Sequence, residues 1–152
     1  MKLSLLTVLA LLLACSSSCA QESTKADGAW AQNRALWESK HIKDYDMVVE
    51  RLQGGTYSYV PYLISVRDGK VANKTPARPN TGLEVVDSYE AVETVDKMFD
   101  TIRRGCEDRT EMKVEYDLVT GAPMSIGFTG NTYVADAGYA YRVNELTPLE
   151  FQ

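Results

Sequence analysis

The chain has 152 residues, which is enough for one domain with a hydrophobic core and too few for two ordinary domains. Hydrophobic residues make up 45% of the chain and charged residues 24%, so the composition excludes a disordered chain and a membrane protein with several spans. The formal net charge of -5 argues against a nucleic acid partner, because binding phosphates requires clustered lysine and arginine.

The chain begins with an export signal. Lys2 precedes an apolar run, residues 3–13, that is too short to cross a bilayer. The following Ala14-Cys15 resembles the lipobox of bacterial lipoproteins, in which the cysteine is lipidated and becomes the new N-terminus. We therefore expect a lipoprotein signal peptide over residues 1–14 and a lipid on Cys15. The alternative is cleavage behind Ala20, which would give a secreted or periplasmic chain.

The lipid implies that the chain is anchored in the bacterial cell envelope, because buried acyl chains hold a protein on a membrane. Ser16 stands where an aspartate would favour the inner membrane, so the resemblance to lipoproteins implies the outer membrane, facing the periplasm, in a two-membrane host. Residues 15–28 are small and polar and predict a flexible tether. A single domain then covers residues 29–152.

The first element of this domain is a predicted helix from Ala29 to about His41. The segment contains no glycine or proline, and Trp30 and Trp37 lie on one helical face. Asp27 is the expected N-cap.

Strands and turns follow this helix. Residues 45–52 predict a strand, and Pro61 predicts an edge or a break because proline cannot donate to a ladder. Asp68-Gly69 predicts a tight hairpin turn, since such turns need positive φ, and Val71 and Asn73 begin the return strand. Residues 72–82, with two prolines and a glycine, predict a long exposed loop.

The second half repeats the order of helix and strands. Asp87 and Glu90 resemble a capping box for a helix whose apolar face runs from Val92 to Ile102, and Gly105 is expected to end it in positive φ. Strands are then predicted over residues 112–118, 124–128 and 139–143, and the turn between the first two contains Thr120-Gly121.

These elements predict an α+β fold with two helix-plus-hairpin halves. Hairpins dominate, so the sheet is expected to be largely antiparallel. Both amphipathic helices should pack on one face of the sheet, because their apolar stripes must be buried.

Three segments carry a resemblance to a known family: Trp37 with Asp44-Tyr45, VRDGKV at residues 66–71, and VEYDLVTGAPMSIGF at residues 114–128. Together they resemble DUF6174, an uncharacterised bacterial domain found in exported lipoprotein-like chains, over roughly residues 30–149. The resemblance implies a fold and no particular reaction or ligand. The arrangement is also similar to helix-plus-meander modules of PepSY type and of periplasmic inhibitors.

Catalytic and metal sites are not expected. His41 is the only histidine, and no nucleophile elbow, zinc-binding pair or phosphate loop occurs in the sequence. Cys106 lacks a neighbouring base and is expected to be a structural thiol or a partner of Cys19. Glu93 and Asp96 are three residues apart but do not follow the calcium-loop pattern. We therefore predict no enzyme, cofactor or bound metal.

Tyrosine suggests the binding site, because its ring adds contact area while its hydroxyl stays hydrated. We predict a binding patch at Tyr57, Tyr59, Tyr62 and Arg78, near the expected sheet edge at Pro61; the alternative is that these tyrosines reflect strand propensity alone. The leading hypothesis is a membrane-tethered module that binds an envelope protein. A small-ligand carrier using a concavity between helices and sheet is the alternative, and an enzyme of unfamiliar type is third.

Overall fold

A computed structural model of the chain describes residues 21–53, 57–78, 89, 92–108, 110–129 and 138–149. Its helices are α1 (Gln21–Ser39) and α2 (Val95–Glu107). Its strands are β1 (Tyr45–Gln53), β2 (Tyr57–Ser58), β3 (Tyr62–Arg67), β4 (Lys70–Pro76), β5 (Met112–Tyr116), β6 (Pro123–Phe128) and β7 (Tyr139–Pro148). The expected α+β fold is therefore confirmed.

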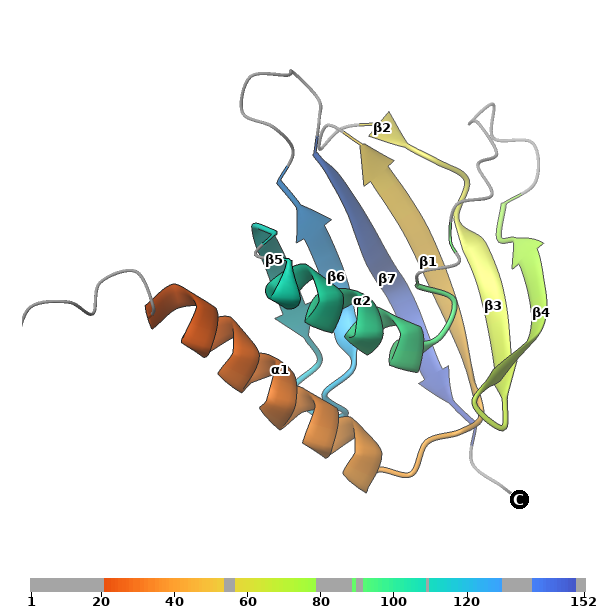
Figure 1. Cartoon of the computed structure of the whole chain (residues 1–152). Coiled ribbons are helices and arrows are strands. Elements are labelled where there is room, and N and C mark those ends of the chain that lie inside the picture. Colours follow the sequence, from red (N-terminus) through yellow and green to blue (C-terminus); the bar gives the residue numbers. More distant parts are fainter. Residues whose placement is uncertain are drawn as a thin grey trace, which may run out of the picture.

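All described strand pairs are antiparallel, and they form one sheet in the order β4-β3-β1-β7-β6-β5, with short β2 paired to the end of β1 (Figure 1). The last strand, β7, pairs with the first, β1, along nearly its whole length. The two halves of the chain therefore meet in the middle of a single sheet, and β4 and β5 form its two edges.

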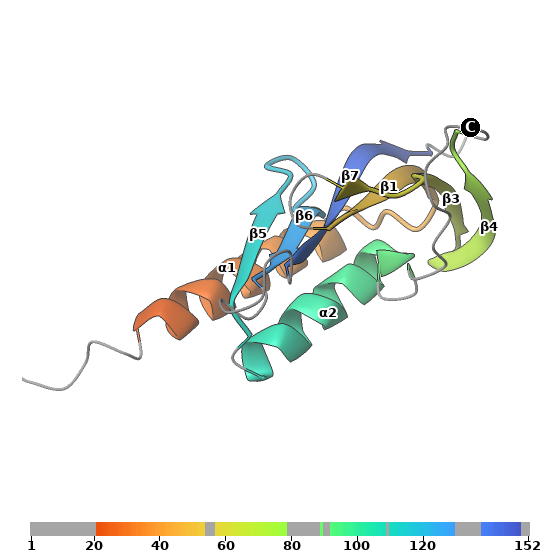
Figure 2. The same ribbon diagram turned by 90° about the horizontal axis from the view of Figure 1, so that it is seen from above.

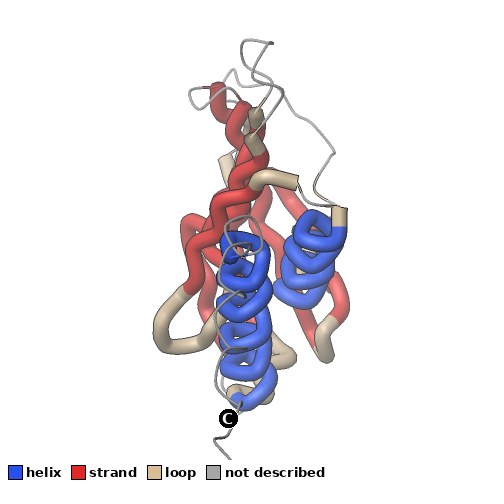
Figure 3. Tube along the Cα trace, turned by 60° about the vertical axis from the view of Figure 1, so that its left-hand side comes forward, coloured by secondary structure: helices blue, strands red, loops and turns tan. Residues whose placement is uncertain are grey.

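Both helices lie on the same side of the sheet, side by side, as predicted (Figures 2 and 3). The space between helices and sheet is filled by one buried cluster that draws on both helices and on the four central strands. Its largest fully buried side chains include Tyr45, Met47, Ile64, Met98 and Phe99. Burial of these side chains is the main stabilising contribution of the fold.

Helix α1 begins eight residues earlier than predicted, so the segment expected to be a flexible tether is helical from Gln21 onward. Asp27, the predicted N-cap, lies inside the helix. The prediction placed the start behind Gly28, but a glycine inside a helix costs only about 1 kcal/mol relative to alanine. The stretch from Gln21 contains no proline that would end the helix.

Helix α2 begins at Val95, because the side chain of Thr94 accepts a hydrogen bond from the Lys97 N–H at 3.1 Å and caps the helix. The predicted capping residues Asp87 and Glu90 lie outside the described residues. The helix does not end at Gly105, which stays helical and buried where a Cβ would collide with the Met112 side chain. Close packing between helix and strand explains this glycine.

The hairpin at Asp68-Gly69 is confirmed, with φ of 48° and 71° at the two turn residues, as a primed turn requires. Pro61 lies in the predicted break, between β2 and β3. Two expectations were wrong. Residues 72–76 continue β4 because they pair with β3, and Leu118 lies in a turn instead of a strand, with 91% of its surface exposed.

Candidate functional site

Both helices lie on one face of the sheet, and no described helix packs on the opposite face (Figure 2). Along β1 and β3, buried side chains alternate with accessible ones, so the accessible ones share the face opposite the core. We call this surface the open face; it contains Asp46, Val48, Glu50, Leu63, Ser65, Arg67, Thr75, Ser125 and Arg142, which are cross-strand neighbours in the observed register.

The open face is charged but balanced. Arg67 Nη1 lies 2.9 Å from Asp46 Oδ1, and Arg142 Nη1 lies 3.4 Å from Glu50 Oε1. Arg67 is the chief cause of a pKa of Asp46 below the usual aspartate value. Between these pairs, Leu63 exposes 37% of its surface next to Val48. The alternation of β1 was visible in the sequence, but nothing local indicated which strands would extend this face.

The structure buries two of the residues predicted to form an exposed tyrosine patch. Tyr59 is 9% exposed and Tyr62 is 6% exposed. Tyr57 lies in β2, and its side chain is outside the described part of the chain. Arg78 is exposed, two residues beyond the end of β4. Tyr59 and Tyr62 therefore cannot provide the exposed rings that the prediction required.

Tyr62 instead belongs to an aromatic cluster in the core, whereas the Tyr59 hydroxyl donates a hydrogen bond to Gln53 at 2.6 Å and its ring lies under the Arg51 guanidinium. The Tyr62 and Tyr89 ring centroids are 5.0 Å apart, and Tyr141 is 6.1 Å from Tyr89. The Tyr89 hydroxyl accepts a hydrogen bond from the Arg51 N–H and donates one to the Val60 carbonyl, both at 3.1 Å. Burial raises the pKa of Tyr89 to about 12, so this hydroxyl stays protonated at neutral pH.

A second buried hydroxyl supports the start of α2. Tyr45 accepts a hydrogen bond from the Val95 N–H at 2.9 Å, and its pKa is raised to about 12, chiefly by burial. A donor in the first turn of a helix has no partner within the helix, so this side chain completes the cap that Thr94 begins. The contact joins β1 to α2.

The acidic residues at the start of α2 are engaged by cations from the protein itself. Glu93 accepts hydrogen bonds from Lys74 at 3.0 Å and Lys97 at 2.9 Å, and its side chain is only 14% exposed. Burial alone would raise the pKa of Glu93, but the two lysines hold it below the usual value. Asp96 pairs with Arg34 at 2.7 Å. Within the described ranges, no three histidine, cysteine, aspartate or glutamate residues could hold a metal ion together.

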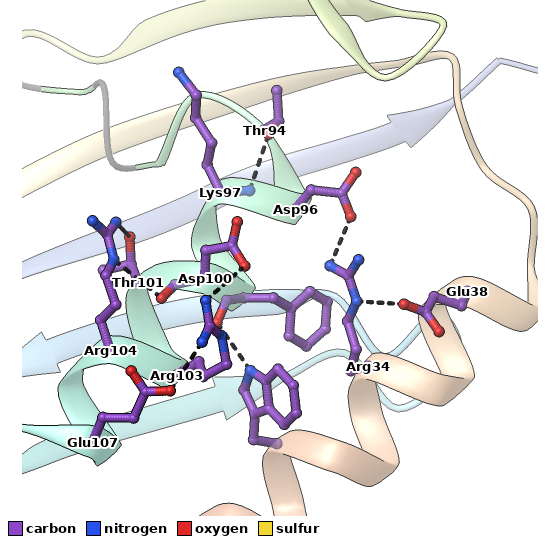
Figure 4. Close-up of polar contacts among 12 residues, drawn as sticks. Arg34, Glu38, Thr94, Asp96, Lys97, Asp100, Thr101, Arg103, Arg104 and Glu107 are labelled. Carbon is purple, nitrogen blue, oxygen red and sulfur yellow. Dashed lines mark hydrogen bonds and ion pairs between the residues drawn. The ribbon is translucent and has the colours of Figure 1, made fainter.

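The two helices contact each other through polar side chains and through aromatic side chains (Figure 4). Arg34 bonds both Glu38 and Asp96, each at 2.7 Å, and its guanidinium lies over the Phe99 ring. The Trp30 indole donates to the Phe99 carbonyl at 2.9 Å. This network holds α1 against α2, so α1 is part of the domain.

The remaining candidates are separated in space. His41 is exposed, with φ of 52°, and its N–H donates to the Glu38 carbonyl just beyond the end of α1. Cys106 lies on α2 and is half-buried. The predicted lipidation site Cys15 and the thiol of Cys19 lie outside the described part of the chain. Neither described helix is long and apolar enough to span a membrane.

Comparison with known proteins gives one match. A family model described as a family of unknown function (DUF6174) matches residues 29–148, which confirms the resemblance seen in the sequence. The comparisons with curated proteins and with solved structures found no match. The matched range covers α2 and all the described strands, but it begins inside α1.

Proposed function

We propose that this chain, which belongs to the DUF6174 family of unknown function, is a bacterial envelope lipoprotein that binds another protein through its open face. In this proposal the signal peptide is removed before Cys15, the lipidated cysteine holds the chain on a membrane, and the domain performs no catalysis. The likeness to PepSY-type and periplasmic inhibitor modules belongs to the same proposal, since such small domains also present a sheet.

One observation carries the proposed binding role: the helices cover a single face of the sheet. The opposite face presents side chains from neighbouring strands without a described element packed on them. Its charges are paired within the face, as for Asp46 with Arg67. A balanced surface of this kind suits a protein of mixed polarity better than an anionic lipid or a polyanion, which requires an excess of cations.

The carrier hypothesis required a concavity between the helices and the sheet. In the described part of the chain, this space is occupied by the core side chains, among them Trp37, Tyr45 and Phe99. No observation favours a small ligand there, and we do not propose one.

Crosslinking in living cells tests the proposed binding. The full lipidated chain is compared with a lipidated tether that lacks the domain, and recovered partners are identified by mass spectrometry. Leu63→Glu then places a charge on the open face and should strongly reduce recovery of a domain-dependent partner. Leu63 is chosen because it is an exposed apolar side chain next to Val48 on the open face, where a glutamate would be left without a partner when a protein covers it.

Val71→Glu provides a matched control. Val71 is 38% exposed, nearly the same as Leu63, and it stands opposite buried Val66, so it lies on the other face of the sheet. Recovery should survive this change. If both variants recover the partner equally, the open face is not the binding surface. If the full chain recovers no partner beyond those of the tether control, the domain is not a binding module. Intact mass tests the anchor separately, because a triacylated chain starting at Cys15 differs from a bare chain starting at Gln21.

A further inference from the structure

The turn between β5 and β6 exposes two adjacent apolar side chains. Leu118 is 91% exposed and Val119 is 69% exposed, far more than any other large hydrophobic residue in the described part of the chain. Apolar side chains that protrude from a turn gain nothing for folding, since they stay in water. Because the two side chains are adjacent, they form a small apolar patch that a surface outside the domain can cover.

This turn is rigid. The Asp117 carboxylate accepts hydrogen bonds from the backbone N–H groups of Val119 and Thr120 and from the Thr120 hydroxyl. The Gly121 N–H donates a hydrogen bond to the Asp117 carbonyl at 2.8 Å, which closes the turn. The two apolar side chains are therefore held in place before they meet a partner, which lowers the entropic cost of binding.

The turn packs against helix α1, the element closest in sequence to the proposed anchor. A Cβ on Gly121 would lie 3.0 Å from the Leu36 Cβ and 3.1 Å from the Trp37 nitrogen. Only five residues of the sequence lie between Cys15 and Gln21, where α1 begins. The turn therefore lies against α1, and the first residue of α1 is close in the sequence to the proposed anchor.

The exposed side of α1 next to this turn carries no charge between residues 28 and 37. The exposed positions there are Gly28, Ala31, Gln32 and Ala35, while Arg34 is half-buried and turned toward Asp96. Helix α2 differs, because its exposed positions are mostly charged, including Asp96, Lys97, Asp100, Arg103 and Arg104. The next exposed residue on this side of α1, Glu38, is paired with Arg34 at 2.7 Å. Because charges resist transfer out of water, a lipid surface can approach this side of α1 at lower cost than the exposed side of α2.

We propose that these residues form a membrane-contact face: Gly28, Ala31, Gln32 and Ala35 of α1 with Leu118 and Val119 of the turn. The occupant is the bilayer that carries the lipid anchor, and the two turn side chains enter its headgroup and acyl boundary. This inference rests on the proposed lipidation of Cys15. It makes the domain lie on the membrane in a defined orientation and leaves the open face of the sheet free for a partner.

Quenching by brominated lipid tests this contact. The lipidated full-length chain carrying Leu118→Trp is reconstituted into vesicles of phosphatidylethanolamine and phosphatidylglycerol with brominated acyl chains. The parent, which contains Trp30 and Trp37, supplies the background signal. Leu63→Trp on the open face is the matched control, because the same tether holds it near the membrane. Unchanged far-ultraviolet circular dichroism and a cooperative urea transition show that each variant is folded, and Val119→Trp is a second probe.

We expect loss of emission and a shift to shorter wavelength for tryptophan at position 118, no change for tryptophan at position 63, and no effect of added salt on either. Equal quenching at both positions would show proximity through the tether alone and would overturn the contact. The contact would also be overturned if tryptophan at position 118 is not quenched, or if its quenching is lost in high salt. A shift of its emission wavelength that depends on protein concentration and occurs without vesicles would overturn the contact as well, and would indicate that a second copy of the chain covers this face. Intact mass of the same preparation reports lipidation independently, so failure of the anchor and failure of the contact are distinguishable.

Discussion

Replacing Gly121 with alanine tests how the β5–β6 turn is held against α1. Gly121 has φ of 79°, and a Cβ there would collide with the Asn33 carbonyl and press on Leu36. Left-handed backbone costs an alanine about 1–2 kcal/mol, and forcing atoms into a packed contact costs about 1–3 kcal/mol. We therefore expect Gly121→Ala to lower the free energy of unfolding by about 2–5 kcal/mol.

Gly69→Ala separates these two contributions. Gly69 has nearly the same φ, 71°, but no atom lies within 4 Å of the position its Cβ would take. It should lose only the backbone contribution of about 1–2 kcal/mol. Urea unfolding followed by tryptophan fluorescence gives both values. Equal losses in the two variants would refute the claim that close approach to α1 requires this glycine.

Three further predictions concern buried polar groups. Tyr45→Phe should cost about 1–3 kcal/mol in urea unfolding, because it leaves the Val95 N–H buried without its acceptor; a change within the error of wild type would contradict the cap. Tyr45 and Tyr89 have pKa values of about 12, above the ordinary 10, so their neutral forms favour the folded state. Stability should be full below pH about 10 and fall as pH rises toward 12, by about 1.4 kcal/mol per pH unit for each tyrosine, with a smaller loss in Tyr45→Phe. Tyrosinate absorbance and unfolding midpoints measure this, and normal titration of both groups would exclude it. Glu93→Gln should cost about 1–3 kcal/mol at neutral pH because it weakens the bonds to two lysines, whereas the exposed Glu107→Gln should change stability by less than about 0.5 kcal/mol. Because folding lowers the pKa of Glu93, its contribution to the free energy of unfolding is present above the ordinary pKa of 4.5 and disappears as the pH falls through the pKa of the folded state. Coinciding acid unfolding curves of the two variants would refute this.

The two proposed surfaces divide the molecule between two partners. The membrane-contact face uses α1 and the turn at Leu118, while the open face uses the side of the sheet that neither helix covers. A domain held by a lipid alone can turn freely on its tether, whereas a second contact limits the orientations it samples. The helical start of α1 at Gln21 contributes to this restriction, because it shortens the flexible part of the tether expected from the sequence.

Local rules account for what was predictable in this fold. The hairpin at Asp68-Gly69 follows from the φ values that only certain residues adopt easily, and the strands β1 and β3 follow from period-two alternation. The apolar face of α2 follows from the spacing of Met98, Phe99 and Ile102. Each of these signals depends on residues within a few positions of one another.

The candidate site was not predictable in the same way. Tyr59 and Tyr62 were placed on the surface because an edge was expected near Pro61, but β3 lies between β1 and β4 and its tyrosine joins the core. Leu118 continued an alternating pattern and was expected in a strand, yet the Asp117 side chain ends β5 by capturing the backbone of the turn. Hydrogen bonds from a side chain to the backbone compete with the hydrogen bonds between strands. A pattern of apolar and polar residues does not reveal them.

The sequence by itself determined the family, the α+β class, the existence of both helices and the main hairpin, because each depends on short-range spacing or on a local motif. Only the tertiary structure decided that β7 pairs with β1, that both helices leave one face of the sheet open, and that Leu118 and Val119 protrude beside α1. Alternation along a strand predicts that the strand has one buried and one exposed face. Which face the helices cover depends on residues far away in the chain. Contacts between distant residues, which carry no local signal, therefore decide which surfaces of this protein are exposed.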